Sequence, residues 1–191
     1  MKLIFIYILF VIGGLLCIHA SWLPAKAWLS QQLISYSWHQ SIDQQKLYRK
    51  KVAIKPWPWA DTFPIAELSF KRIEKDIVVL NGGDPTTLAF SAGAIAPFNL
   101  ANHTSAFVVA GHNDSHFSFL EDVIMKDVIS MTDQYGKSQL YQVEAIDIID
   151  ASSGQLPIVT NNSSLILITC YPFSSVGNNT NERYVITAKL I

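Results

Sequence analysis

Three side chains in this sequence could together carry out acyl transfer: those of Cys170, His112 and Arg183. A cysteine reacts as its thiolate and needs a basic or cationic neighbour. A histidine can accept or donate a proton near neutral pH. An arginine stays charged and can stabilise the oxyanion that forms when a thiolate attacks a carbonyl carbon. These residue types therefore suit a cysteine nucleophile acting on a carbonyl group.

Each of the three residues borders a segment that is expected to form a strand. Cys170 ends the run LILITC, His112 follows VVAG, and Arg183 opens RYVITAKL. Cys170 and Arg183 are thirteen positions apart, which suits two neighbouring antiparallel strands joined by a loop. His112 can join them only through the fold.

Each residue also has an interpretation without catalysis. A cysteine at a strand end is commonly a small buried hydrophobe, and an arginine that opens a strand is commonly a solvated edge charge. A histidine after a strand usually lies at the surface or is hydrogen-bonded in the core. A zinc site is a further alternative, because His112 and His116 are spaced i, i+4 and Cys170 could be a third ligand. No fourth ligand is evident, so no metal is predicted.

The elements that would position these residues are mainly short strands. Apolar and β-branched runs alternate with turn sequences such as NGGDP (81–85) and YGK (135–137). One short helix is expected at about His116 to Met125. About eight strands with little helix favour an all-β barrel or sandwich. The expected strands are residues 65–70, 77–80, 87–90, 105–111, 127–132, 139–150, 164–170 and 183–190.

The N-terminal segment is apolar enough for a membrane helix. Residues 3–23 contain no Asp, Glu, Lys or Arg, and at ~1.5 Å rise per residue they could cross a hydrocarbon layer of ~30 Å. We interpret residues 1–23 as a signal anchor, with cleavage near AKA (25–27) as the alternative. Cys17 fits an apolar cysteine in this helix better than a lipoprotein cysteine, because Leu16 is larger than that processing site normally accepts.

A second, amphipathic helix is predicted over residues 24–48. Pro24 suits its first turn, and apolar residues such as Ile34 and Trp38 recur at three- and four-residue spacings. The sequence KPWPW (55–59) then ends any helix. These boundaries divide the chain into an anchor (1–23), a helical linker (24–55) and a folded domain (56–191).

Composition gives little support to several classes of protein. Half of the 191 residues are apolar and the net charge is −1, so nothing indicates a nucleic-acid partner. Two cysteines in such different settings do not make a disulfide framework, which leaves Cys170 as a free thiol. No clear acidic cluster indicates calcium, and no cofactor is predicted.

The ordered motifs VVAGHNDSHFSFL (108–120), LITCYPF (167–173) and NERYVITA (181–188) resemble those of the sortases. Sortases are membrane-anchored cysteine transpeptidases, and the resemblance implies their closed eight-stranded β-barrel with one or two short helices. The membrane helix and the amphipathic helix would precede it. PAKAWL (24–29) and KPWPWADTFPIAEL (55–68) are similar to the Gram-negative, marine proteobacterial branch.

The resemblance also implies roles for individual residues. Cys170 would be the nucleophile, His112 the general acid and base, and Arg183 the group that stabilises the oxyanion or binds the substrate. Thr169 and Asn113, which neighbour the first two in sequence, are expected to contact the substrate.

Two positions depart from the sortase pattern. Ile166 stands where the Thr-Leu-x-Thr-Cys motif begins with Thr, and Asn113 stands where many relatives have Arg. His116 is a second candidate base, but its place in the expected short helix favours a supporting or packing role.

The implied reaction is cleavage of an LPxTG-like sorting motif between Thr and Gly, through a thioacyl-enzyme that passes its acyl group to an amine. The implied partners are an envelope protein with a C-terminal sorting signal, an amine acceptor and the inner membrane. The enzyme would cross that membrane once, with its catalytic domain facing the periplasm. The loop from Pro172 to Glu182 would border the substrate groove.

The sequence leaves two other functions open. An L,D-transpeptidase would also be a β-rich envelope enzyme with a catalytic cysteine. It should show a Ser-x-Gly-Cys motif with Arg close behind, whereas here Thr169 precedes Cys170 and Arg183 is distant. A non-catalytic periplasmic binding module on the same barrel would tolerate loss of Cys170.

Overall fold

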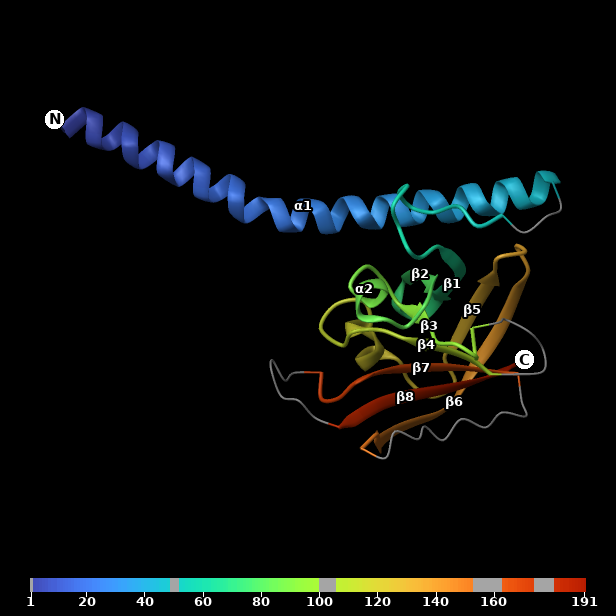
Figure 1. Cartoon of the computed structure of the whole chain (residues 1–191). Coiled ribbons are helices and arrows are strands. Elements are labelled where there is room, and N and C mark those ends of the chain that lie inside the picture. The colour runs from blue at the N-terminus through green and yellow to red at the C-terminus, as the bar shows by residue number, and fades with distance from the viewer. Residues whose placement is uncertain (1, 49–51, 100–105, 153–162, 174–180) are drawn as a thin grey trace.

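The structure is a long helix beside a closed β-barrel (Figure 1). It is a computed structural model that describes residues 2–48, 52–99, 106–152, 163–173 and 181–191. Around the barrel the strands follow the order β1-β2-β3-β4-β7-β8-β6-β5, and β5 pairs with β1 to close it. The predicted closed, eight-stranded barrel is therefore confirmed. The strands are β1 (Pro64–Phe70), β2 (Lys75–Asn81), β3 (Gly93–Ala94), β4 (Phe107–Ala110), β5 (Val128–Asp133), β6 (Ser138–Asp150), β7 (Ser164–Cys170) and β8 (Glu182–Leu190).

The strand predicted at residues 87–90 is wrong. The short helix α2 (Pro85–Leu88) covers the first half of this segment, a turn covers the second half, and the two-residue strand β3 follows. The carboxylate of Asp84 accepts hydrogen bonds of 3.0 Å from two backbone N–H groups in the first turn of α2. Proline at the first helical position has a backbone angle that already suits a helix. Asp-Pro therefore begins a helix here, although the residues after it favour a strand.

The expected helix near His116 to Met125 is present as a short 3₁₀ helix, η2 (Ser118–Asp122). It lies in the connection between β4 and β5 that also contains His112. Leu120 is the buried residue of this helix, so it fixes the connection to the barrel core.

The two helices predicted at the N-terminus form one continuous helix, α1 (Lys2–Tyr48), with Pro24 inside it. Figure 1 shows that α1 bends within its blue N-terminal half. A proline inside a helix removes one backbone hydrogen bond and favours such a kink. The helix is long and apolar enough to cross a membrane, and its most apolar stretch is not buried against the barrel.

The second half of α1 packs against β1 and β2. Its buried stripe contains Ile34 and Trp38, each 1% exposed, together with three serines. The hydroxyl groups of Ser30, Ser37 and Ser41 donate hydrogen bonds of 2.7–2.8 Å to carbonyl groups in the preceding turn of the same helix. These serines can therefore be buried without leaving polar groups unpaired.

Replacing Trp38 with alanine should lower the free energy of unfolding by about 3 kcal/mol, because it removes a fully buried aromatic side chain. Chemical denaturation of the full chain in detergent would measure the loss. Trp28 is a matched control on the same helix, since its side chain is 66% exposed. Equal effects of Trp38→Ala and Trp28→Ala would contradict the packing of α1 on the barrel.

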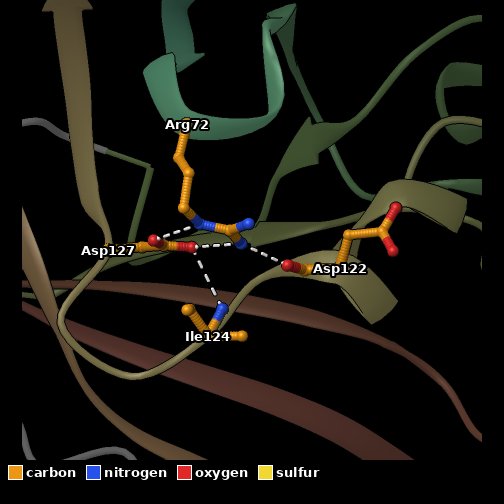
Figure 2. Close-up of polar contacts among 4 residues, drawn as sticks. All are labelled: Arg72, Asp122, Ile124 and Asp127. Carbon is orange, nitrogen blue, oxygen red and sulfur yellow. Dashed lines mark hydrogen bonds and ion pairs between the residues drawn. The ribbon is translucent and has the colours of Figure 1, made fainter.

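An ion pair holds the turn after β1 to the connection that carries His112 (Figure 2). Nε and a terminal nitrogen of Arg72 donate to the two carboxylate oxygens of Asp127 at 2.6 and 2.8 Å, and Arg72 also donates to the carbonyl of Asp122. Asp127 accepts a further bond of 3.0 Å from the backbone N–H of Ile124. The hydrogen bond from Arg72 is the main cause that lowers the pKa of Asp127. This pair anchors the end of the connection that lies before β5.

Candidate active site

Cys170 and Arg183 lie opposite each other on neighbouring strands. Cys170 ends β7, and in the antiparallel pairing with β8 its partner is Arg183. Directly paired residues point to the same face of a sheet, so the thiol and the guanidinium share one face. Cys170 is an exposed, free thiol, which excludes the interpretation as a small buried hydrophobe. Arg183 is half-buried and donates a 2.8 Å bond from a terminal nitrogen to the carbonyl of Glu182.

His112 reaches the same end of the barrel through β4, which lies beside β7 in parallel pairing. The last pair is Ala110 with Ile168, so His112 lies two residues beyond the end of β4, at the same end of the sheet as Cys170. The backbone N–H of Gly111 continues the ladder with a 3.2 Å bond to the carbonyl of Ile168. The three residues that the sequence singled out therefore lie at the same end of three adjacent strands, β4, β7 and β8.

Hydrogen bonds fix the backbone on each side of His112. The buried hydroxyl of Thr169 donates a 2.7 Å bond to the carbonyl of Gly111. The side-chain amide of Asn113 donates a 3.0 Å bond to the carbonyl of Pro172. The carbonyl of His112 itself accepts a 2.9 Å bond from the backbone N–H of Phe117. The side chain of His112 is therefore exposed, while hydrogen bonds from the neighbouring residues fix the position of its backbone.

The tight packing of the His112 loop also depends on Gly111. A side chain at this position would put its Cβ only 2.8 Å from the ring of Phe117, which is fully buried. Glycine therefore allows the loop to lie directly on the core.

His116, the second candidate base, lies against another part of the protein. Its Nε2 is 3.4 Å from the carbonyl of Ala89, and it lines a groove between α1 and the barrel with residues such as Trp28. Burial is the main cause that lowers its pKa, and the nearby charge of His112 adds to the effect. Within the described ranges, no three or more His, Cys, Asp or Glu side chains form a group that could hold a metal, so the zinc alternative finds no support.

An apolar strip leads along the same face toward Cys170. Ile166 and Ile168 precede Cys170 at two-residue intervals on β7 and therefore point to the same side of the sheet. They pack with Val108 of β4 and Val185 of β8 in a buried cluster separate from the barrel core. The active-site face is thus apolar along the strands and polar at their end.

Aromatic residues that the sequence analysis did not single out follow Cys170. The rings of Tyr171 and Tyr184 are stacked with centroids 6.2 Å apart, and Phe173 meets Tyr184 edge to face at 5.0 Å. Burial is the main cause that raises the pKa of Tyr184. The motif CYPF already shows Tyr171 and Phe173, but only the ring contacts in the structure reveal Tyr184 as their partner. The predicted groove-bordering loop, residues 172–182, lies largely outside the described residues.

Comparison with known proteins agrees with this arrangement. A family model described as a sortase domain matches residues 68–191. Sortase D of Bacillus subtilis (strain 168) is 26% identical over 125 residues, which make up 65% of this chain and 62% of that protein. The chain therefore spans less than two thirds of the length of this relative.

Solved structures show the same fold. The catalytic domain of SrtD from B. anthracis is 28% identical with a TM-score of 0.56, over 67% of this chain and 87% of that one. A sortase D5 transpeptidase from Clostridium perfringens reaches a TM-score of 0.65 at 16% identity, over 85% and 98% of the two chains. For sortase A from Corynebacterium diphtheriae the TM-score is 0.58 at 22% identity, over 85% and 82%. Since the sortase model matches well over half of the residues, this protein belongs to the sortase family of transpeptidases.

Proposed function

We propose that the protein is a membrane-anchored cysteine transpeptidase that cleaves an LPxTG-like sorting motif between Thr and Gly. The observation that carries the proposal is that Cys170, His112 and Arg183 all lie at one end of three adjacent strands, in a chain of the sortase family. The substrate is a cell-envelope protein with a C-terminal sorting signal. The acceptor is an amine.

In the first step the thiolate of Cys170 attacks the carbonyl carbon of the Thr–Gly peptide bond. The carbonyl electrons move to oxygen, and the guanidinium of Arg183 stabilises the resulting oxyanion. When the oxyanion collapses, the C–N bond breaks and the imidazolium of His112 gives its proton to the departing glycine amine. The product is a thioester between Cys170 and the threonine of the substrate.

The second step reverses these roles. Neutral His112 takes a proton from the incoming amine, whose nitrogen attacks the thioester carbon. Arg183 again faces the oxyanion, and the thiolate of Cys170 leaves as the new amide forms. One difficult amide exchange becomes two easier steps.

The side chains of the apolar strip, Ile166, Ile168, Val108 and Val185, are at most 7% exposed, so they support the strands that carry the site and do not themselves contact the substrate. For Thr169 we propose that it positions the His112 loop and does not make the predicted contact with the substrate. Its side chain is 2% exposed and bonded to the carbonyl of Gly111, so it ties β7 to the His112 loop.

We further propose that α1 anchors the enzyme in the inner membrane as an uncleaved signal anchor with the barrel in the periplasm. The length and apolar composition of α1 support a membrane span. The similarity of PAKAWL (24–29) and KPWPWADTFPIAEL (55–68) to Gram-negative sortases supports that location and that branch.

The two alternative functions have less support. An L,D-transpeptidase would carry its arginine close behind the cysteine in sequence, whereas Arg183 arrives from the next strand. A non-catalytic binding module offers no reason for an exposed thiol paired with an arginine.

Product analysis tests the proposal. The purified full chain would be incubated with peptides of the form Leu-Pro-x-Thr-Gly and with triglycine as the amine, and the products read by mass spectrometry. The expected products are the released glycine-side fragment and a threonine–triglycine amide. Cleavage at another bond would contradict the assigned motif.

A further inference from the structure

Asn113 makes a contact that crosses the active site. Its side-chain amide donates a 3.0 Å hydrogen bond to the carbonyl of Pro172. In sequence Asn113 directly follows His112, and Pro172 stands two residues after Cys170. The bond therefore joins the loop that carries the proposed general acid to the segment that follows the proposed nucleophile.

A second connection lies on the other side of the same pair. Gly111, just before His112, donates from its N–H to the carbonyl of Ile168 and accepts from the hydroxyl of Thr169 at its own carbonyl. The residues on both sides of His112 are thus bonded to residues on both sides of Cys170. Gly111 makes its two hydrogen bonds through backbone groups, whereas Asn113 makes its bond through a side chain that a substitution can remove.

We propose that Asn113 is a positioning residue that holds the imidazole of His112 beside the thiol of Cys170, instead of the substrate contact that the sequence predicts. This role rests on the proposed function. The acceptor is a backbone carbonyl, so the bond needs a donor at position 113. The half-buried amide of Asn113 supplies it, whereas an ionised aspartate would only accept hydrogen bonds and would face the carbonyl oxygen of Pro172.

The geometry predicts a distinct kinetic signature. Without the hydrogen bond from Asn113 to Pro172, the imidazole is no longer held where it can protonate the leaving amine. We therefore expect kcat to fall while KM stays the same. For Asn113→Ala we expect about a tenfold fall in kcat, a part of the about 10²- to 10⁴-fold that positioned general acid–base catalysis contributes. Asn113→Asp should be at least as impaired, and Asn113→Gln, which keeps the amide donor, should recover part of the rate.

A double-mutant cycle separates positioning from substrate contact. Acylation by a Leu-Pro-x-Thr-Gly peptide would be followed by mass for wild type, Asn113→Ala, His112→Ala and the double variant, all as the full chain in detergent. If Asn113 acts through His112, the double variant should have the same acylation rate as His112→Ala, because Asn113 then has no imidazole to position. Asp114→Ala is the matched control, because Asp114 is the next, exposed residue of the loop, and it should retain the wild-type rate.

The outcomes separate this role from the proposed function itself. Multiplicative rate losses in the double variant, or a higher KM with unchanged kcat, would overturn the positioning role and favour a substrate contact. Equal rates for wild type and Asn113→Ala would overturn it as well. Failure of wild type to react with any peptide of the form Leu-Pro-x-Thr-Gly would instead overturn the proposed function.

Discussion

Replacing Cys170 with alanine should abolish acyl-enzyme formation and transpeptidation while the barrel stays folded. Alanine offers no nucleophilic atom, so neither step of the exchange can begin. Cys170 is the exposed last residue of β7, so losing its sulfur opens no cavity in the core. The free energy of unfolding should change by no more than about 0.5 kcal/mol. Peptide cleavage and a denaturation curve measure the two effects.

The chain contains its own control for this variant. Cys17 is the other cysteine, far away in the apolar part of α1, and Cys17→Ala should cleave the peptide at the wild-type rate. A thioester that still forms in Cys170→Ala would show that another residue is the nucleophile.

Replacing Arg183 with lysine should lower the acylation rate by about 10²-fold or more, the scale of losing an oxyanion donor. Lysine keeps the positive charge but lacks the planar guanidinium, whose several N–H groups can bond two partners at once. Arg183 bonds the carbonyl of Glu182 through one terminal nitrogen, and its place opposite Cys170 in the strand pairing puts the guanidinium on the same face as the thiol. A single-turnover measurement with saturating peptide isolates the step.

Arg72→Lys provides the matched control for Arg183→Lys. Arg72 also makes two-point contacts, but with Asp127 at the turn after β1. Its side chain is 45% exposed, so the substitution should have a small effect on stability and none on the acylation rate. Near-normal acylation by Arg183→Lys would confine Arg183 to a structural role.

Most of the barrel could be predicted because its long strands carry their own pattern. Strands such as β7 and β8 have enough β-branched and apolar residues between turn signals to be recognised. The two-residue strand β3 has no such pattern. It depends on Gly93, because a Cβ at this position would clash with the carbonyl oxygen of Gly82. In the neighbouring segment, the apolar residues at 87–90 favour a strand, but the cap from Asp84 stabilises the helix α2 instead.

The N-terminal helix shows a different limit. Proline is favoured in the first turn of a helix, so the sequence predicts a helix start at Pro24, whereas α1 continues through this residue. The burial of the serines in α1 could not be predicted either. Serine is usually expected at the surface, and it is buried here because its hydroxyl bonds a carbonyl of the same helix.

In the candidate site, the reactive residues could be named from sequence but their supports could not. Cys170, His112 and Arg183 have suitable side chains and border strands, but it is the resemblance to the sortase motifs that favours catalysis over their structural interpretations. The bonds from Thr169 to Gly111 and from Asn113 to Pro172 join residues more than fifty positions apart. Such contacts follow from the parallel pairing of β4 with β7, which a single sequence does not specify.

The mass added to Cys170 tests the central claim most directly. The full chain would be incubated with a library of Leu-Pro-x-Thr-Gly peptides without an amine, digested, and analysed for the modified cysteine. The account predicts a thioester on Cys170 that carries the fragment ending in threonine, and its disappearance when triglycine is added. An adduct on another residue, a fragment that begins with glycine, or no adduct from any peptide would contradict it.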